Sequence, residues 1–355
     1  MRILFLVNEL LQVCGVSKHL YHLIDGLLKY YPDDEYFIMT GGGNSIQKFQ
    51  PLGVPVIVCE NLRHESRSIT GYIKGIKEVY SFVKNNNVQI IHSHHHYAAS
   101  VSSVVSKFAN VKTILTNHGL LPEVGILNHF DAGHIIVVNQ HIKNYLINNR
   151  MKKNQNISFI PYGFPKIDNA NKKRVEKVRV VSGGRFVKEK GFESLIKAIA
   201  NLPKETREKA DFFIAGDGEE ALNLTELDKK LNTKINFLGT ISNFQEELLE
   251  MDIVVMTTFS KAEGFPTVLL EAGFAKNLVI SSKFRGSDLV LNEGNSLLYD
   301  SEKPEELTSL LNNAINNFNN YVDLAEKYHE DVTKSFSLEK MVRSTEALYK
   351  KLLNT

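Results

Sequence analysis

The stretch E-G-F-P-T-V-L-L-E places two glutamates, Glu263 and Glu271, around a predicted helix start. Pro266 suits the first position of a helix, so the amides of Thr267 and Val268 remain as donors at the positive end of the helix dipole. Glu271 lies about five residues inside this helix, which is about 7 Å along its axis. The pattern therefore fits an anion at the helix end, with a carboxylate on each side to bind hydroxyl groups.

The same residues also fit an ordinary helix start, in which Glu263 complements the helix dipole and Glu271 faces solvent. Glu271, however, stands between the apolar segments T-V-L-L and A-G-F-A. A buried carboxylate without a partner is costly. We therefore expect Glu271 to be buried and to have a partner, and a ligand ordered as sugar, diphosphate and ribose would fit the spacing of the two acids.

A second candidate is the loop within S-G-G-R-F-V-K-E-K-G-F. Gly183 and Gly184 permit a tight turn after a strand, and Gly191 opens the next helix. Arg185 and Lys190 add two cations, which suit a diphosphate because arginine binds phosphate oxygens bidentately. The spacing matches neither a P-loop nor G-x-G-x-x-G. A glycine turn with exposed cations remains the alternative.

In the first half of the chain, His118 and Gly15 each stand in a turn after a predicted strand. At that edge of an α/β sheet, His118 would point into a ligand cleft, and Gly15 would let its backbone approach a phosphate. The segment I-I-H-S-H-H-H-Y supplies a predicted polar loop on the acceptor side, with His92, His94, His95 and His96. We predict no metal there, because no i, i+4 helical pair, neighbouring cysteine or carboxylate completes a site.

Short apolar runs alternate with longer helical segments throughout most of the chain, which indicates parallel sheets covered by helices on both faces. The series is interrupted at P-Y-G-F-P-K-I-D-N-A-N-K-K-R-V-E-K, which looks like a linker. We therefore predict an α/β protein with two doubly wound, Rossmann-like domains, residues 1–165 and 166–335, facing across a cleft, and a final helix over 336–355. Ligands of such sheets bind beyond the carboxyl ends of the strands.

The composition excludes several classes of protein. The 355 residues carry a net charge of +2, without a basic tract for nucleic acid. Cys14 and Cys59 stand far apart and form no zinc or disulfide pattern, so we expect reduced thiols, with Cys59 within a strand. An apolar run of about 20 residues and a secretory cleavage site are both missing, which favours the cytoplasm.

Five segments in order resemble family 4 of the retaining GT-B glycosyltransferases, whose signature is E-x7-E. Besides E-G-F-P-T-V-L-L-E, they are V-V-S-G-G-R-F-V-K-E-K-G-F, F-F-I-A-G-D-G-E-E, I-N-F-L-G and F-I-P-Y-G-F. The resemblance covers nearly the whole chain. It implies the GT-B fold, with a nucleotide-sugar donor in the second domain, an acceptor in the first, and a terminal helix that crosses back onto the first domain.

The resemblance also implies roles for individual residues. His118, Glu263, Arg185 and Lys190 would act in catalysis, with the two cations on the diphosphate and His118 beside the donor sugar. Glu271 would bind the ribose. The remaining donor contacts would come from backbone or neighbouring positions, namely Gly15, Gly184, Gly216, Gly264, Phe265, Pro266, Thr267 and Val268.

The implied reaction is transfer from a nucleotide-diphosphate sugar, most simply UDP-linked, to a glycan, lipid-linked or protein acceptor in polysaccharide or glycoconjugate biosynthesis. The resemblance implies no metal and no cofactor, and a cytoplasmic enzyme, with peripheral association at the inner face of the membrane left open. A basic segment with Arg63, Arg67, Lys74, Lys77 and Lys84 suits such a membrane or an ordinary solvated helix.

The chain departs from the family pattern at several positions. Cys14-Gly15 replaces a double glycine, Arg285-Gly286 replaces the later one, and Tyr162 stands at the common asparagine. These changes put the phosphate loop and the sugar preference in doubt. A sugar-nucleotide epimerase of the same fold and a non-catalytic accessory subunit that binds nucleotide sugar are the alternative functions.

Overall fold

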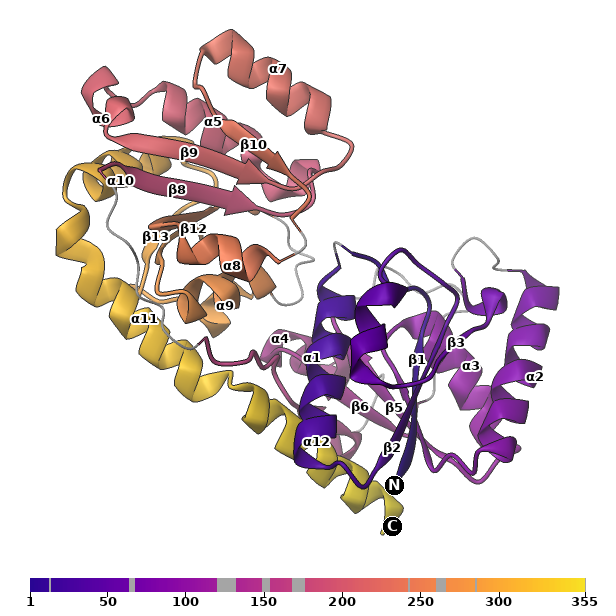
Figure 1. Ribbon diagram of the computed structural model, residues 1–355. Coiled ribbons are helices and arrows are strands. Elements are labelled where there is room, and N and C mark those ends of the chain that lie inside the picture. Colours follow the sequence, from indigo (N-terminus) through magenta and orange to yellow (C-terminus); the bar gives the residue numbers. More distant parts are fainter. Residues whose placement is uncertain are drawn as a thin grey trace. The chain divides into compact units, whose positions relative to one another are not determined.

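The computed structural model describes residues 1–12, 14–63, 68–119, 132–148, 154–167, 176–241, 243–259, 266–284 and 286–354. The chain divides into two compact units (Figure 1). Unit 1 contains Met1–Pro165 together with Leu338–Thr355, and unit 2 contains Lys166–Ser337. The last helix of the chain is therefore part of the unit that holds the first strand.

Unit 1 is built on a seven-stranded parallel sheet of order β3-β2-β1-β4-β5-β6-β7. Its strands are β1 (Arg2–Val7), β2 (Glu35–Thr40), β3 (Val56–Val58), β4 (Ile90–Ser93), β5 (Lys112–Asn117), β6 (His134–Val137) and β7 (Ile157–Phe159). The central strands are buried almost throughout, as expected for a sheet covered on both faces.

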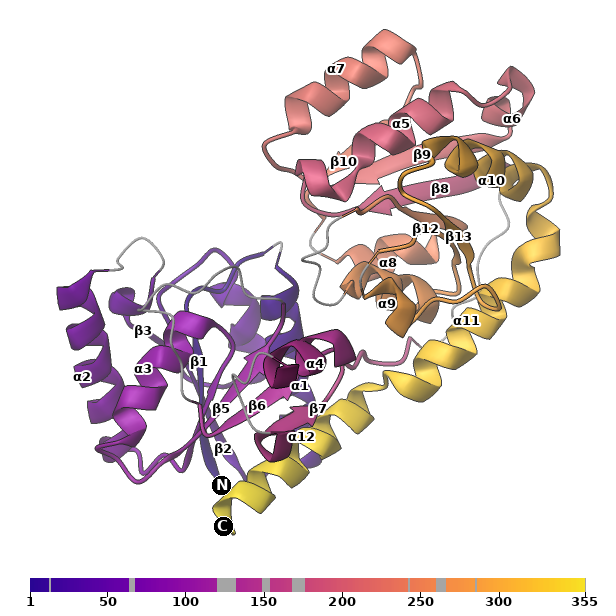
Figure 2. The same ribbon diagram turned by 180° about the vertical axis from the view of Figure 1, so that it is seen from behind.

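The helices of unit 1 bury apolar stripes against that sheet. They are α1 (Gly15–Tyr30), α2 (Ile69–Asn85), α3 (His96–Ser106), α4 (Gln140–Asn148) and α12 (Leu338–Leu353). Helix α12 packs beside α1, and its Met341, Val342 and Tyr349 join the core formed by Leu20 and Leu23 of α1. Helices α2 and α3 contribute to a separate core cluster. Figure 2 shows α12 running along this unit toward the C-terminus.

Unit 2 has a six-stranded parallel sheet of order β10-β9-β8-β11-β12-β13. Its strands are β8 (Val178–Gly183), β9 (Ala210–Ala215), β10 (Asn236–Gly239), β11 (Ile253–Met256), β12 (Leu278–Ser282) and β13 (Leu297–Tyr299). Its helices are α5 (Phe192–Ala200), α6 (Lys204–Glu208), α7 (Ala221–Leu231), α8 (Phe244–Leu249), α9 (Thr267–Phe274), α10 (Pro304–Asn316) and α11 (Val322–Ser335).

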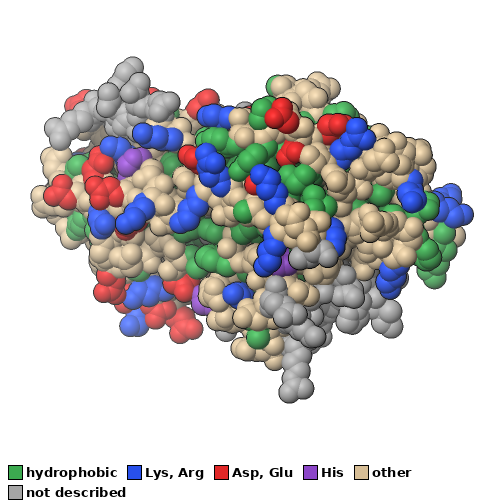
Figure 3. Space-filling model, turned by 90° about the horizontal axis from the view of Figure 1, so that it is seen from below, with side chains coloured by type: hydrophobic (Ala, Val, Ile, Leu, Met, Phe, Trp, Pro, Cys, Tyr) green, Lys and Arg blue, Asp and Glu red, His purple; other side chains and the backbone are tan. Residues whose placement is uncertain are grey.

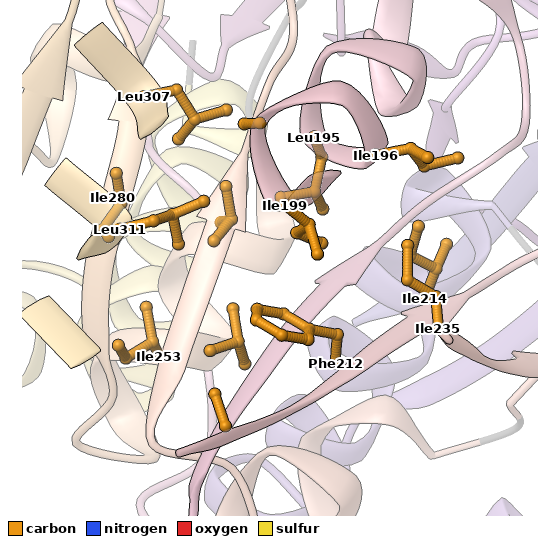
Figure 4. Close-up of a cluster of buried hydrophobic side chains, with 14 of the residues drawn as sticks. Leu195, Ile196, Ile199, Phe212, Ile214, Ile235, Ile253, Ile280, Leu307 and Leu311 are labelled. Carbon is orange, nitrogen blue, oxygen red and sulfur yellow. The ribbon is translucent and has the colours of Figure 1, made fainter. Parts of the chain in front are cut away.

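The core of unit 2 forms where α5 and α10 meet the sheet. Figure 4 shows Leu195 and Ile199 of α5 and Leu307 and Leu311 of α10 directed toward Phe212 and the other strand residues. These side chains are almost completely buried. Burying one such side chain stabilises the fold by about 1.5–3 kcal/mol, so the cluster anchors the strands whose ends carry the candidate site.

In each sheet, the order in which the chain adds strands reverses at one point. The chain builds outward from β1 to β3 and then restarts on the other side at β4, and unit 2 repeats this pattern between β8 and β11. Ligands of open α/β sheets bind at this switch point, beyond the carboxyl ends of the strands. In unit 2, β8 and β11 pair through Val180 with Ile253 and Val181 with Val254, before both strands end.

The two predicted doubly wound domains are confirmed, but three local predictions were wrong. Pro266 precedes α9 as its N-cap, and Thr267 is the first helical residue. His92 lies inside β4 with its side chain fully buried, while His96 begins α3, so the four histidines do not share one loop. Cys59 follows β3 instead of belonging to it.

No described helix is both long and apolar enough to cross a bilayer. On the face shown in Figure 3, basic, acidic and hydrophobic side chains are interspersed. Helix α2 exposes Ile69 and Ile73 beside Lys74 and Lys77, so the apolar and basic residues of the segment share one side of the helix.

His92 connects the sheet of unit 1 to its last helix. Its Nδ1 lies 2.6 Å from the Tyr349 hydroxyl of α12, and its Nε2 lies 2.7 Å from the Thr116 hydroxyl of β5. Burial, followed by the nearby His19 ring, lowers the pKa of His92 to about 3. The imidazole is therefore neutral at physiological pH, with one nitrogen donating and the other accepting.

This burial predicts acid sensitivity of unit 1. The pKa of His92 in the folded protein is about 3, below its ordinary value of 6.5, so the unfolded chain binds more protons between these values and stability falls as the pH falls. His92 alone contributes a loss of about 2 kcal/mol from about pH 7.5 to about pH 5. Urea unfolding followed by circular dichroism at each pH should show this loss diminished in His92→Gln. Identical pH dependence in the two proteins contradicts the assignment.

Candidate active site

The first candidate region lies beyond β8, where the loop turns from the strand toward α5. Arg185 is exposed and Lys190 half-buried, whereas Phe186 between them packs into the core. The loop ends at Gly191, whose φ of 67° favours glycine. A Cβ atom there would lie 2.3 Å from the Thr257 carbonyl oxygen, so only glycine allows the approach. The two cations thus flank a buried aromatic anchor in the predicted strand-to-helix loop.

The segment beyond β11 lies against this loop. The Thr257 hydroxyl donates to the Lys190 carbonyl at 2.7 Å, and the Phe259 amide donates to the Glu189 carbonyl at 3.0 Å. The hydroxyl of Ser282, the last residue of β12, donates to the Thr258 carbonyl at 2.5 Å. The loop of residues 184–191, which we call the cationic loop, is therefore fixed by hydrogen bonds to the segment that leads to α9. Glu263, Gly264 and Phe265, which continue that segment, lie outside the described residues.

Gly216 follows β9 and packs against the start of the cationic loop. Its amide donates to the Gly239 carbonyl at 2.7 Å. A Cβ atom at Gly216 would lie 1.9 Å from the Gly184 carbonyl oxygen, and its φ is 141°. The structure therefore gives Gly216 a packing reason to be glycine, because it lets the turn after β9 support the turn after β8.

Helix α9 begins at Thr267 and is buried along most of its length. Its N-cap, Pro266, makes no side-chain capping hydrogen bond, and the Leu269 amide bonds the Pro266 carbonyl at 3.0 Å. Thr267 and Val268 are half-buried. The first turn therefore offers backbone amides that no side chain caps, as an anion site at a helix end requires.

Glu271 is buried within α9, with only 3% of its surface exposed. The helix is held by α11, because Tyr328 donates its hydroxyl to the Leu269 carbonyl at 2.8 Å and His329 Nδ1 lies 3.0 Å from the Gly273 carbonyl. A Cβ atom at Gly273 would lie 2.7 Å from Val332 Cγ2, so the helices pack too closely for a larger residue. The predicted burial of Glu271 is confirmed, and the alternative in which Glu271 faces solvent is wrong.

The second candidate region lies in unit 1, around His118. His118 follows β5, and its Nε2 lies 3.2 Å from Nδ1 of His94, which follows β4. Its other nitrogen, Nδ1, lies 2.5 Å from the Tyr162 hydroxyl. His19 of α1 stacks on the Tyr162 ring at a centroid distance of 4.4 Å and meets the His118 ring edge-on at 5.0 Å. Segments distant in sequence thus place three imidazoles and a phenol together.

These imidazoles are neutral. Burial lowers the pKa of His19 to about 3, with a further contribution from His22. The pKa values of His94 and His118 also lie well below their ordinary value, first because of burial and then because the surrounding histidines repel a second positive charge. A neutral imidazole keeps one lone pair as an acceptor or ligand and one N–H as a donor.

Gly15 stands at the first position of α1, with a solvent-exposed backbone. Cys14 caps this helix in an extended conformation, without a side-chain hydrogen bond. Gly15 therefore belongs to the start of the helix after β1, at the switch point of unit 1, and not to a turn of its own.

Two residues of the histidine cluster escaped sequence reasoning. His19 lies inside an amphipathic helix, where its spacing resembles that of core residues. Tyr162 was noted only as a departure from a common asparagine. In the structure, Tyr162 follows β7 and its hydroxyl contacts His118, so it is part of the cluster. The available signal was His19 itself, a histidine on the apolar face of the helix that follows the first strand, in a domain where another strand end is rich in histidine.

Two family profiles match consecutive parts of the chain. The profile described as "Glycosyltransferase Family 4" matches residues 13–165, and that described as "Glycosyl transferases group 1" matches residues 163–331. Together they span residues 13–331 and meet at the boundary between the two units.

Two proteins with similar sequences are named as glycosyltransferases. An uncharacterized glycosyltransferase of Methanocaldococcus jannaschii is 24% identical over 84% of this chain and 76% of its own length. The gpi3 subunit of phosphatidylinositol N-acetylglucosaminyltransferase from Schizosaccharomyces pombe is 24% identical over 89% of this chain and 79% of its own.

Among solved structures, Anabaena HepE in complex with UDP has a TM-score of 0.82 and 19% identity, over 99% of this chain and 100% of its own. This likeness confirms the fold, because the two backbones match over nearly their whole length although few residues are identical. The ordered motifs and the two profile matches then identify the chain as a member of glycosyltransferase family 4.

Proposed function

We propose that this glycosyltransferase transfers a sugar from a UDP-sugar to a glycan or lipid-linked acceptor, with retention of configuration and without a metal ion in the transfer step. One observation carries the proposal. The cationic loop of Arg185 and Lys190 is hydrogen-bonded through the Lys190 carbonyl to Thr257, in the segment that leads to the start of α9. We infer that these cations, the amides at the start of α9 and the buried carboxylate form one site at the switch point of unit 2, where β8 and β11 are neighbours.

The chemistry required of this site is stabilisation of a leaving group. When the bond between the sugar and the diphosphate breaks, negative charge develops on the departing phosphate oxygen. Arg185 and Lys190 would bind these oxygens, and the Thr267 and Val268 amides would donate to them. Donors held in place before the reaction are worth more than solvent, since they need not reorganise. Glu263 is proposed to bind the sugar hydroxyls and Glu271 those of the ribose.

In this mechanism the sugar passes through an oxocarbenium-like state. The acceptor hydroxyl attacks on the face from which the diphosphate departs, and its proton passes to the departing phosphate oxygen. This course gives retention without a covalent enzyme intermediate. In unit 1, His118 is proposed to contact the donor sugar as a neutral imidazole, and Gly15 to offer its backbone to phosphate.

Two findings from relatives support the choice of substrates. The Anabaena structure contains UDP, and the Schizosaccharomyces pombe protein is named for transfer of N-acetylglucosamine to a phosphatidylinositol lipid. We infer a UDP-sugar donor and a lipid-linked or glycan acceptor for this chain. The product separates this proposal from epimerase activity, because an epimerase converts the nucleotide sugar without any acceptor.

The first test concerns the two cations. Replacing Arg185 or Lys190 by alanine removes a charge-assisted hydrogen bond of about 1.5–3 kcal/mol, so the Kd for UDP should rise by about 10- to 150-fold. Lys188→Ala is the matched control, because Lys188 is an exposed lysine of the same loop. Its Kd should change by less than about threefold. Isothermal titration calorimetry checks all three variants, and equal effects in the three would contradict the site.

The second test concerns Glu271. If its carboxylate binds the ribose hydroxyls, Glu271→Gln should weaken UDP binding by about tenfold or more but weaken binding of 2′,3′-dideoxy-UDP much less. The two changes form a cycle whose coupling isolates the contact. Circular dichroism controls for the buried position of Glu271. Equal losses for both ligands would show that Glu271 acts on the fold and not on the ribose.

A further inference from the structure

Three histidines of unit 1 converge in a way that the proposed role of His118 in transfer does not require. His19 lies on α1, His94 follows β4, and His118 follows β5. One side-chain nitrogen of each ring lies within 4.8 Å of one from each of the others. His19 and His94 are more than nine-tenths buried, and His118 is half-buried. The group lies entirely within one unit, so its geometry does not depend on unit 2.

The spacing fits tetrahedral metal coordination. Zinc binds imidazole nitrogen at about 2.0–2.1 Å, so two such ligands of a tetrahedral ion lie about 3.3–3.4 Å apart. His94 Nδ1 and His118 Nε2 are 3.2 Å apart, close to this separation. With 4.8 Å as the upper limit for the third nitrogen, His19 needs to approach by at most about 1.4 Å, a movement that side-chain rotation supplies.

The hydrogen bonding of the cluster also fits a metal ion. Among the described residues, His19 Nδ1 is buried without a hydrogen-bond partner. Such an atom is costly to bury, and metal coordination is one way to satisfy the ring. His118 Nδ1 lies against the Tyr162 hydroxyl. A metal-bound histidine commonly donates its second N–H to such a group, which fixes the ring and its tautomer.

The ligand set selects the kind of ion. Three imidazoles without a carboxylate in the described cluster suit zinc, nickel or copper and do not suit magnesium or calcium, which prefer oxygen. Burial keeps the three rings neutral, as metal ligands must be. Three nitrogens leave a fourth position open, as in zinc sites that also bind a small ligand.

We propose that His19, His94 and His118 bind one Zn²⁺ ion, or a similar borderline transition-metal ion. Because Nδ1 of His118 faces the Tyr162 hydroxyl, Nε2 is the nitrogen left for the donor sugar. Metal binding would occupy this same Nε2, so the metal acts as an inhibitor of transfer. This second part rests on the proposed function of His118. The first part, metal binding itself, does not.

The test uses the full-length, tag-free protein after treatment with a chelator. Zn²⁺ is titrated against a chromophoric chelator, and Co²⁺ substitution reports the ligand geometry through its visible absorption bands. We expect one bound ion, tetrahedral cobalt bands, and at least tenfold weaker binding in His19→Gln and in His94→Gln. His22→Gln is the matched control, because His22 lies one turn further along α1, is half-buried and lies outside the trio.

Circular dichroism verifies that each variant is folded. The proposal is overturned if the folded wild type binds no Zn²⁺, or if His22→Gln weakens binding as much as His94→Gln does. UDP binding is measured in parallel with and without Zn²⁺. Unchanged UDP binding with loss of transfer supports inhibition through His118, whereas transfer unaffected by bound Zn²⁺ overturns the inhibition and leaves the metal site standing.

Discussion

The hydrogen bond from the Thr257 hydroxyl to the Lys190 carbonyl joins the two strand ends on which the proposed donor site depends. Gly191 must approach Thr257 for this contact to form, and any side chain at Gly191 would collide with the Thr257 carbonyl. Because β8 and β11 are adjacent in the sheet, this contact lies at the switch point itself. A glycine, a threonine and the strand order together bring a pair of cations to the segment that leads to α9.

Unit 1 buries several histidines, and burial keeps their rings uncharged. His92 is satisfied on both nitrogens by Tyr349 and Thr116 and serves to connect α12 with the sheet. His94 and His118 bond each other, and His118 also bonds Tyr162. Neutral rings retain lone pairs, so the same burial that makes unit 1 sensitive to acid makes the cluster suited to a hydroxyl group or a metal ion.

The sequence predicted those features that depend on neighbouring residues. Alternating strands and helices predicted both sheets, the apolar surroundings of Glu271 predicted its burial, and the glycines around Arg185 predicted the turn after β8. Periodicity could not show that Gly216 supports the Gly184 turn, because that contact joins two loops through the sheet order.

The histidine cluster was beyond sequence reasoning for a similar reason. The H-S-H-H-H segment by itself predicts no metal site, because it has no i, i+4 helical pair, neighbouring cysteine or carboxylate. The additional rings come from α1 and from the end of β5, and only the fold places them beside His94. His92, by contrast, looked like part of a loop but lies in β4, since a buried strand can accommodate a histidine whose two nitrogens are both bonded.

We propose that the loop after β8 and the start of α9 bind a nucleoside diphosphate. A crystal structure of the protein with UDP tests it most directly. We expect diphosphate oxygens within hydrogen-bond distance of the Arg185 guanidinium and the Lys190 ammonium group, and ribose hydroxyls on the Glu271 carboxylate. Well-defined UDP at another place, with these three side chains free of it, would contradict the account.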